Sequence, residues 1–242
     1  MFGTIRNIEG EQIDYTFHPG DKSRNVIVVL GHGVTGNKDR PFVVALAEAL
    51  SHDGIPTLRL SFSGNGNSEG RFEDSTISKE VADLRCVLDA LDGWKILYVG
   101  HSMGGAVGVL LAGKDTRMVG LVSLAGMVHT EAFAQREFGD VTPDEGFMWD
   151  EPSCPLSQAF LDDTAAIGTV VTRAPSIRVP WLLVHGTEDD VVPLQDSLDI
   201  FERANEPRQL VRIEGANHVF SEHTPEMIKV VHEWVREQVG RG

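Results

Sequence analysis

The chain is predicted to fold as a mainly parallel eight-stranded sheet with helices on both faces and a small helical cap. Short apolar runs alternate with amphipathic segments along most of its 242 residues. Runs such as 26–30 are β-branched throughout, which is typical of strands buried on both faces. The alternation stops once, over 126–176, where we expect the cap. Function in such a sheet is expected beyond the carboxyl ends of the strands.

The expected elements can be placed in chain order. An antiparallel hairpin is expected over 3–8 and 12–18, around a Glu-Gly-Glu turn. Six further strands are expected at 26–30, 55–60, 96–99, 118–124, 181–185 and 209–213, and helices at 41–50, 76–91, 106–112, 194–203 and 224–239. Residues 1–242 are interpreted as one domain, with 126–176 as a cap inserted within it.

Composition narrows the class of partner. The formal charge is −15 and the isoelectric point is near 4.9, so the surface repels phosphate backbones and anionic lipid headgroups. We therefore expect no nucleic-acid partner and no membrane partner. Cys86 and Cys154 fit neither a disulfide framework nor a metal site, and no cofactor is expected. No apolar leader or membrane-length run is visible, which predicts a cytoplasmic protein. The oligomeric state is left open, with a homodimer as one candidate.

The stretch from Gly100 to Gly105, Gly-His-Ser-Met-Gly-Gly, lies between an expected strand and an expected helix. A serine at a sharp strand-to-helix turn needs small neighbours, and the helix N-terminus favours developing negative charge. Ser102 is thus a candidate nucleophile. A Gly-x-Ser-x-Gly pattern in a chain with 25 glycines can also arise by chance, so the motif depends on its context.

That context is an acid and a histidine in later loops. A serine hydroxyl needs a base to take its proton, and a carboxylate fixes the tautomer of a histidine base. Glu188, Asp189 and Asp190 follow the strand expected at 181–185, and His218 follows the last expected strand. The order serine, acid, histidine resembles that of the serine α/β-hydrolase superfamily, over nearly the full length of the chain.

The resemblance assigns roles to particular residues. It implies Asp189 as the acid, from the pattern Gly-x-x-Asp-x-x-Val-Pro, and leaves Glu188 and Asp190 to a solvated loop. It implies His218 as the base among nine histidines. It also implies that the backbone N–H groups of Val34 and Met103 hold the oxyanion.

Further motifs resemble particular branches of the superfamily. The segment 32–38, the loop 61–70 and the size of the cap are similar to bacterial carboxylesterases of the cinnamoyl or feruloyl esterase type. The serine motif also resembles monoacylglycerol lipases. The loop 61–70 is interpreted as structural, since no Lys-Ser or Lys-Thr follows it as in a phosphate-binding loop.

These observations predict a serine carboxylesterase that cleaves small-molecule esters, of aromatic or short-chain acids, through an acyl-enzyme. Monoacylglycerol lipase, thioesterase and acyltransferase activities could use the same triad, and a binding module of the same fold is the non-enzymatic alternative. Phe147, Trp149 and Phe160 are expected either to line the acyl pocket or to form the core of the cap.

Overall fold

The computed structural model describes residues 2–21 and 25–240. Within them the main sheet has seven strands in the order β3-β5-β4-β6-β7-β8-β9. β3 is antiparallel to β5, and the other neighbours are parallel. The strands are β3 (Tyr15–His18), β4 (Val26–Gly31), β5 (Thr57–Leu60), β6 (Lys95–His101), β7 (Met118–Leu124), β8 (Trp181–Gly186) and β9 (Arg208–Ile213).

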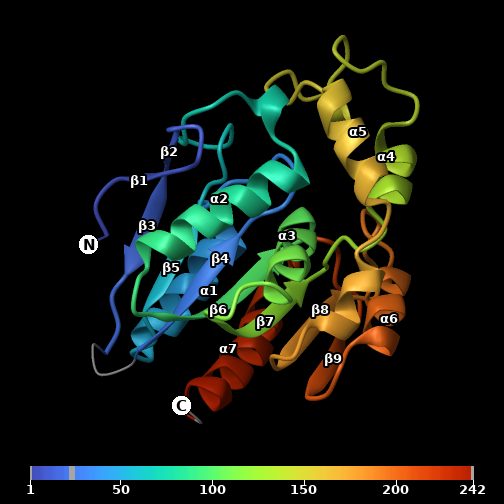
Figure 1. The fold of residues 1–242 in the computed structure, drawn as a ribbon. Helices are drawn as coiled ribbons and strands as arrows, with labels where there is room; N and C mark the ends of the chain where they lie inside the picture. Colours follow the sequence, from blue (N-terminus) through green and yellow to red (C-terminus); the bar gives the residue numbers. More distant parts are fainter. Residues whose placement is uncertain (1, 22–24, 241–242) are drawn as a thin grey trace.

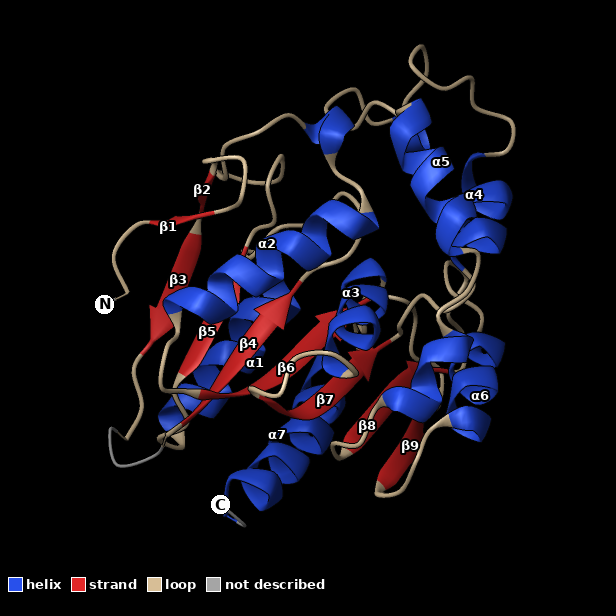
Figure 2. Cartoon of the chain, in the orientation of Figure 1, coloured by secondary structure: helices blue, strands red, loops and turns tan. Residues whose placement is uncertain are grey.

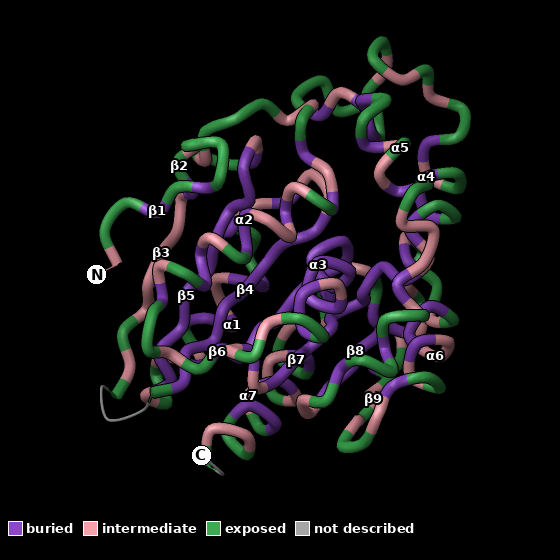
Figure 3. The backbone as a smooth tube through the Cα atoms, in the orientation of Figure 1, coloured by how far each residue is buried: buried purple, intermediate pink, exposed green. Residues whose placement is uncertain are grey.

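Helices cover both faces of this sheet (Figure 2). Side chains alternate along β4: Ile27 and Val29 join the core under α2 and α3, while Val28 and Leu30 join the core under α1 and α7. Figure 3 shows the inner strands β4 to β8 of the sheet as buried almost throughout, whereas the edge strands β3 and β9 are partly exposed. The expected fold class is confirmed. The helices are α1 (Pro41–His52), α2 (Ile77–Ala90), α3 (Met103–Ala112), α6 (Leu194–Arg203) and α7 (Thr224–Gly240).

The expectation of eight strands in one sheet is wrong by one strand. β1 (Ile5–Arg6) and β2 (Gln12–Ile13) pair only with each other, as a separate two-stranded sheet. The first strand is held by polar side chains and not by the sheet edge. Arg6 and the Gln12 N–H both donate to Glu69 Oε2, at 3.0 and 2.8 Å.

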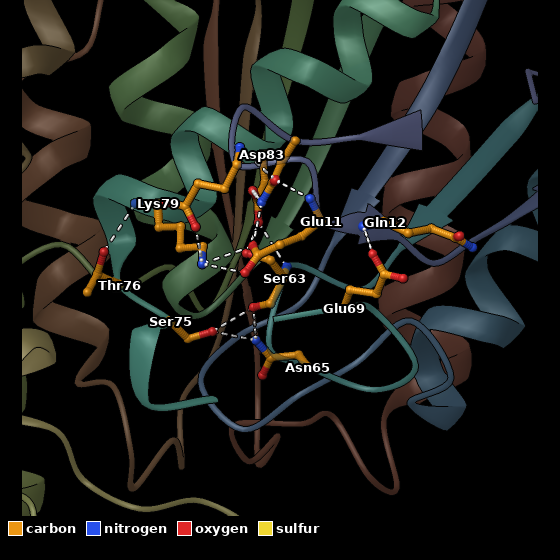
Figure 4. Close-up of polar contacts among 11 residues, drawn as sticks. Glu11, Gln12, Ser63, Asn65, Glu69, Ser75, Thr76, Lys79 and Asp83 are labelled. Carbon is orange, nitrogen blue, oxygen red and sulfur yellow. Dashed lines mark hydrogen bonds and ion pairs between the residues drawn. The ribbon is translucent and has the colours of Figure 1, made fainter. Parts of the chain in front are cut away.

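The loop after β5 packs against the first half of α2 through buried polar groups (Figure 4). The Ser63 hydroxyl and N–H donate to Asp83 Oδ2 at 2.7 and 2.8 Å, and Asn7 donates to Asp83 Oδ1 at 2.9 Å. Asn65 and Ser75 are linked at 2.8 Å in the same loop. These contacts fix the loop against the protein, in agreement with its structural interpretation.

The segment 126–176 between β7 and β8 contains α4 (Thr130–Phe138) and α5 (Gln158–Ile167), with short 3₁₀ turns at Met148–Asp150 and Val171–Ser176. Figure 1 shows both helices set apart from the sheet, beyond the ends of β6 and β7. Phe138 is central to the packing here, with ring centroids 6.0 Å from Phe133 and 6.2 Å from Phe160. Among the residues described, no helix is long and apolar enough to cross a membrane.

Candidate active site

Ser102 lies at the turn where β6 ends and α3 begins. Its φ of 52° and ψ of −119° are strained for a side-chain-bearing residue, a state that surrounding structure must impose. Glycine is required beside it, because a Cβ on Gly100 would fall 2.1 Å from the Gly104 carbonyl oxygen. The side chain of Ser102 faces a cavity and its backbone is tied to β7, through a 2.9 Å bond from its N–H to the Leu124 carbonyl.

The loop after β4 closes over the serine. A Cβ on Gly33 would fall 2.6 Å from Ser102 Cβ and 3.1 Å from its Oγ, so only glycine permits this approach. Val34 follows on the cavity wall, and its N–H has no acceptor among the described residues. Met103 is the first residue of α3, where a helix leaves its N–H without an intrahelical partner. Met103 directly follows Ser102, and Val34 lies on the wall of the same cavity.

His32 holds this loop in place. Its Nε2 accepts a 3.0 Å hydrogen bond from the Phe62 N–H, so Nδ1 carries the proton and donates to the Gly33 carbonyl at 2.9 Å. Complete burial lowers the pKa of His32 to about 4, which keeps the ring neutral near pH 7. His32 therefore fixes the shape of this loop.

His218 and Asp189 form the expected pair. His218 Nδ1 lies 2.9 Å from Asp189 Oδ2, and a carboxylate can only accept, so Nδ1 carries the proton. The other ring nitrogen, Nε2, is then free to accept a proton. The neighbours Glu188 and Asp190 are exposed, whereas the Asp189 side chain is fully buried.

Every side of the Asp189 carboxylate is occupied by a donor. Oδ1 accepts from the N–H groups of Val191 and Val192 at 2.9 and 2.8 Å. Oδ2 also faces His185 Nε2 at 3.3 Å. Burial acts to raise the pKa of Asp189, but the contacts with His185 and His218 outweigh it and hold that pKa well below its ordinary value. The acid is therefore an ionised carboxylate across the physiological range.

His185 is a core residue that also supports Asp189. It is completely buried, and Nε2 lies 2.9 Å from the Val192 carbonyl as well as near the carboxylate. Two acceptors around Nε2 place the proton there, which leaves Nδ1 to accept from the Ser197 hydroxyl at 2.7 Å. Its contact with Asp189 could not be read from spacing, because it depends on how the loop 187–192 folds back.

His101, next to Ser102 in the chain, packs against His218. Its ring centroid is 4.7 Å from that of His218 and 4.8 Å from that of Phe42. Nε2 donates to the His218 backbone carbonyl at 3.0 Å. Burial and the adjacent His218 lower the pKa of His101 to about 3, so it is a neutral support for the loop that carries His218.

Ser102 and His218 open onto one cavity of about 290 Å³. Its walls are mainly apolar and come from the loop after β4, the start of α1, the loops after β8 and β9, and the cap. The lining residues are His32, Gly33, Val34, Thr35, Gly36, Arg40, Phe42, His101, Ser102, Trp149, Val191, His218 and Val219.

The three aromatic residues expected either to line the pocket or to form the core of the cap are in three different places. Trp149 lies on the cavity wall, held by a 3.1 Å hydrogen bond from Nε1 to Glu137 of α4. Phe160 is 1% exposed and packs in the core of the cap. Phe147 is 40% exposed and is not among the residues lining the cavity. Sequence alone could not separate them, because the cap has no periodic pattern that fixes its inner face.

Comparison with known proteins agrees with this geometry. Residues 26–153 match the family described as alpha/beta hydrolase fold, and residues 155–223 match the one described as serine aminopeptidase S33. Bovine mitochondrial palmitoyl-protein thioesterase ABHD10 is 26% identical over 193 residues, which cover 75% of this chain and 62% of that protein. The human protein of the same name is 27% identical, covering 75% and 62%. The match spans about three fifths of these relatives.

Solved structures extend the likeness to nearly the whole chain. Est1E from Butyrivibrio proteoclasticus, described with bound ferulic acid, superposes with a TM-score of 0.87 at 25% identity, covering 98% of this chain and all of that one. Mouse alpha/beta hydrolase domain-containing protein 10 gives 0.78 at 19% identity, covering 97% and 98%. The second likeness shows the fold alone.

Proposed function

The chain belongs to the alpha/beta hydrolase family, and from that premise we propose that it is a serine hydrolase that cleaves carboxylic esters. The observation that carries the proposal is the 2.9 Å contact between His218 Nδ1 and Asp189 Oδ2, beside a strained Ser102 on the same cavity. This pairing presents the basic nitrogen of the imidazole, as general-base activation of a serine requires.

The proposed reaction forms and then hydrolyses an acyl-enzyme. His218 Nε2 takes the proton of Ser102 as Oγ bonds to the ester carbonyl carbon, and the N–H groups of Val34 and Met103 stabilise the oxyanion. The carbon–oxygen bond to the alcohol breaks, and the alcohol leaves with the proton held by His218. Water then attacks the acyl carbon and gives its proton to His218. The bond between the acyl carbon and Ser102 Oγ breaks, His218 returns the proton to Oγ, and the carboxylic acid is released.

Ser102→Ala tests the reaction directly. We expect wild-type protein to hydrolyse para-nitrophenyl esters, and the variant to lose about 10³-fold or more in kcat, because the nucleophile is gone. Ser221→Ala, which changes an exposed serine outside the cavity, is the control. Equal rates for wild type and Ser102→Ala would refute the assignment and would favour a binding module of this fold.

The size and walls of the cavity support small acyl groups. Its volume of about 290 Å³ is near the lower end of ligand-binding pockets, which run from roughly 300 to 1,000 Å³. We infer short-chain or single-ring aromatic acids as substrates, with Trp149 as the aromatic wall. The ferulic acid bound by Est1E supports the aromatic choice, since that structure is similar over its full length.

A series of acyl groups tests the role of Trp149. Trp149→Ala is expected to lower kcat/KM for aromatic esters by about 10-fold more than for acetate esters, because only the larger group reaches the cap. Phe160→Ala is the control for damage to cap packing, and we expect it to lower stability while leaving the aromatic preference unchanged. The same loss for every acyl group in Trp149→Ala would show that the tryptophan only packs the cap.

Thioester cleavage is the second candidate, and the similarity to palmitoyl-protein thioesterases favours it. The same triad would serve, and a palmitoyl chain needs more room than the cavity offers. We therefore expect higher kcat/KM for short oxygen esters than for long-chain thioesters; the opposite order would identify a thioesterase.

Two further activities could use the same triad. Glycerol esters test monoacylglycerol lipase activity, and product analysis with added alcohol tests acyltransferase activity. We also propose that the enzyme acts on small-molecule esters in the cytoplasm and has no nucleic-acid or membrane partner. Cell fractionation tests this location.

A further inference from the structure

One charged side chain stands out on the wall of the cavity. Arg40, at the start of α1, lines the space onto which Ser102 and His218 open. The other lining residues are apolar, small or neutral polar, apart from His218. Burial is the main cause that lowers the pKa of His32 to about 4 and of His101 to about 3, so both rings are neutral near pH 7. The permanent charge of the described cavity wall therefore comes from Arg40.

Arg40 is held in place but not neutralised. Its Nη2 donates to the Thr35 carbonyl at 3.1 Å, which keeps the guanidinium over the loop that closes on Ser102. The adjacent carboxylate, Asp39, is engaged elsewhere: it is paired with Lys38 at 2.8 Å and with Arg59. Among the described residues, Arg40 has no ion pair with an acidic side chain, although the chain as a whole carries −15.

The positive charge of Arg40 acts on two histidines of the cavity wall. It contributes to the lowered pKa of both His32 and His101, after the larger effect of burial. The cavity that Arg40 and Ser102 share is also lined by apolar side chains, including Val34, Phe42 and Trp149. A ligand that fills it would place an apolar segment against these walls and its far end beside a guanidinium. A planar guanidinium with free N–H donors is suited to a carboxylate, which it can bind through two parallel hydrogen bonds.

We propose that Arg40 forms an anion-binding subsite of the active-site cavity, which selects esters that carry a carboxylate on an apolar spacer away from the scissile bond. The inference rests on the proposed esterase function and adds the substrate class. The carboxylate can belong to the acyl group, as in a half-ester of a dicarboxylic acid, or to the alcohol. In both cases Arg40 would bind a carboxylate that lies away from the scissile bond. The test below shows whether that carboxylate belongs to the acyl group or to the alcohol.

Matched pairs of esters measure the preference. The acyl-side pair is the para-nitrophenyl monoester of adipic acid and the para-nitrophenyl ester of hexanoic acid. The alcohol-side pair is the butyrate ester of para-hydroxybenzoate and that of para-hydroxybenzamide. Within each pair the ratio of kcat/KM for the anionic ester to that for the neutral ester is compared between wild type and Arg40→Gln, at fixed ionic strength.

We expect that ratio to fall by about 10-fold in Arg40→Gln for one of the two pairs, which identifies the side of the ester that carries the carboxylate. Arg40→Lys is expected to retain part of the ratio, because it keeps the charge but not the two parallel donors. Arg236→Gln makes the same change of charge at an exposed position on α7 and is expected to keep the wild-type ratio.

The outcomes separate this inference from the proposed function. In one outcome, Ser102-dependent hydrolysis of the neutral esters is found, but for both pairs the ratio of kcat/KM is the same in wild type and Arg40→Gln. That result would overturn the subsite and leave the esterase assignment intact. Absence of ester hydrolysis in wild type would instead refute the proposed function. Where the acyl-side pair shows the effect, a binding measurement avoids turnover. Monomethyl adipate is then expected to bind Ser102→Ala about 10-fold more tightly than it binds Ser102→Ala with Arg40→Gln, and equal affinities would contradict an acyl-side subsite.

Discussion

Two buried carboxyl groups, Asp189 and Glu80, have opposite electrostatic states in this molecule. The Asp189 side chain is 0% exposed, and the residue Glu80 is 1% exposed. Asp189 is surrounded by donors from two histidines and two backbone N–H groups. Both oxygens of Glu80 lack a hydrogen-bond partner among the described residues. Burial alone therefore does not decide the charge of a carboxyl group; the donors around it do.

As a consequence, the pKa values of the two carboxyl groups are shifted in opposite directions. Burial, together with the nearby carboxylates of Asp83 and Asp163, raises the pKa of Glu80 well above its ordinary value. Contacts with His185 and His218 overcome burial and lower the pKa of Asp189. The first group therefore keeps its proton to higher pH than a free carboxyl group does, and the second stays ionised to lower pH. Only the ionised group can orient an imidazole for proton transfer.

The largest expected effect comes from removing the charge of Asp189. In Asp189→Asn the amide can turn its NH₂ group toward His218 and favour the wrong tautomer of the ring, so we expect kcat to fall by on the order of 10³- to 10⁴-fold. Kinetics with a para-nitrophenyl ester measures this loss. Asp190→Asn removes the same charge from the exposed neighbouring position, and we expect its activity to stay near wild type. Similar losses in both variants would show that general loop charge matters and the pairing does not.

A smaller effect is expected from Glu80, on stability and with a definite sign. The folded state keeps the proton that the unfolded chain releases near the ordinary pKa of 4.5. Folding stability is therefore expected to fall as pH rises above that value, by at most about 1.4 kcal/mol per pH unit, until the folded group also ionises. Glu80→Gln cannot ionise and is expected to lack this contribution.

Urea unfolding of wild type and Glu80→Gln, from about pH 5 to about pH 9, measures the difference in the free energy of unfolding. The stability of the variant relative to wild type is expected to grow as pH rises. Glu233→Gln on the exposed face of α7 is the matched control and should show a constant difference. A constant difference for Glu80→Gln as well would mean that the buried group has an ordinary pKa in the folded state.

Local sequence patterns predicted much of this molecule because the fold repeats a local rule. A buried strand followed by a short loop places the loop at the carboxyl edge of the sheet, so the loops that carry Ser102, Asp189 and His218 could be expected at one edge. The choice of Asp189 over its acidic neighbours comes from the family resemblance. The antiparallel pairing of β1 with β2 is predicted from the turn between them and is present. Their separation from the main sheet could not be predicted, since Arg6 contacts Glu69 and Asn7 contacts Asp83, both far along the chain. The same is true of Glu80, whose burial under the cap follows no apolar pattern.

The most direct test of the central claim is covalent labelling of the proposed nucleophile. A fluorophosphonate ester reacts with a serine that a neighbouring base activates, and it forms a stable bond to Oγ. Mass spectrometry of the digested protein is expected to find the label on Ser102 in wild type, and His218→Ala is expected to slow labelling by at least about 10²-fold. Label on another serine, or equal labelling of Ser102 without His218, would contradict the account.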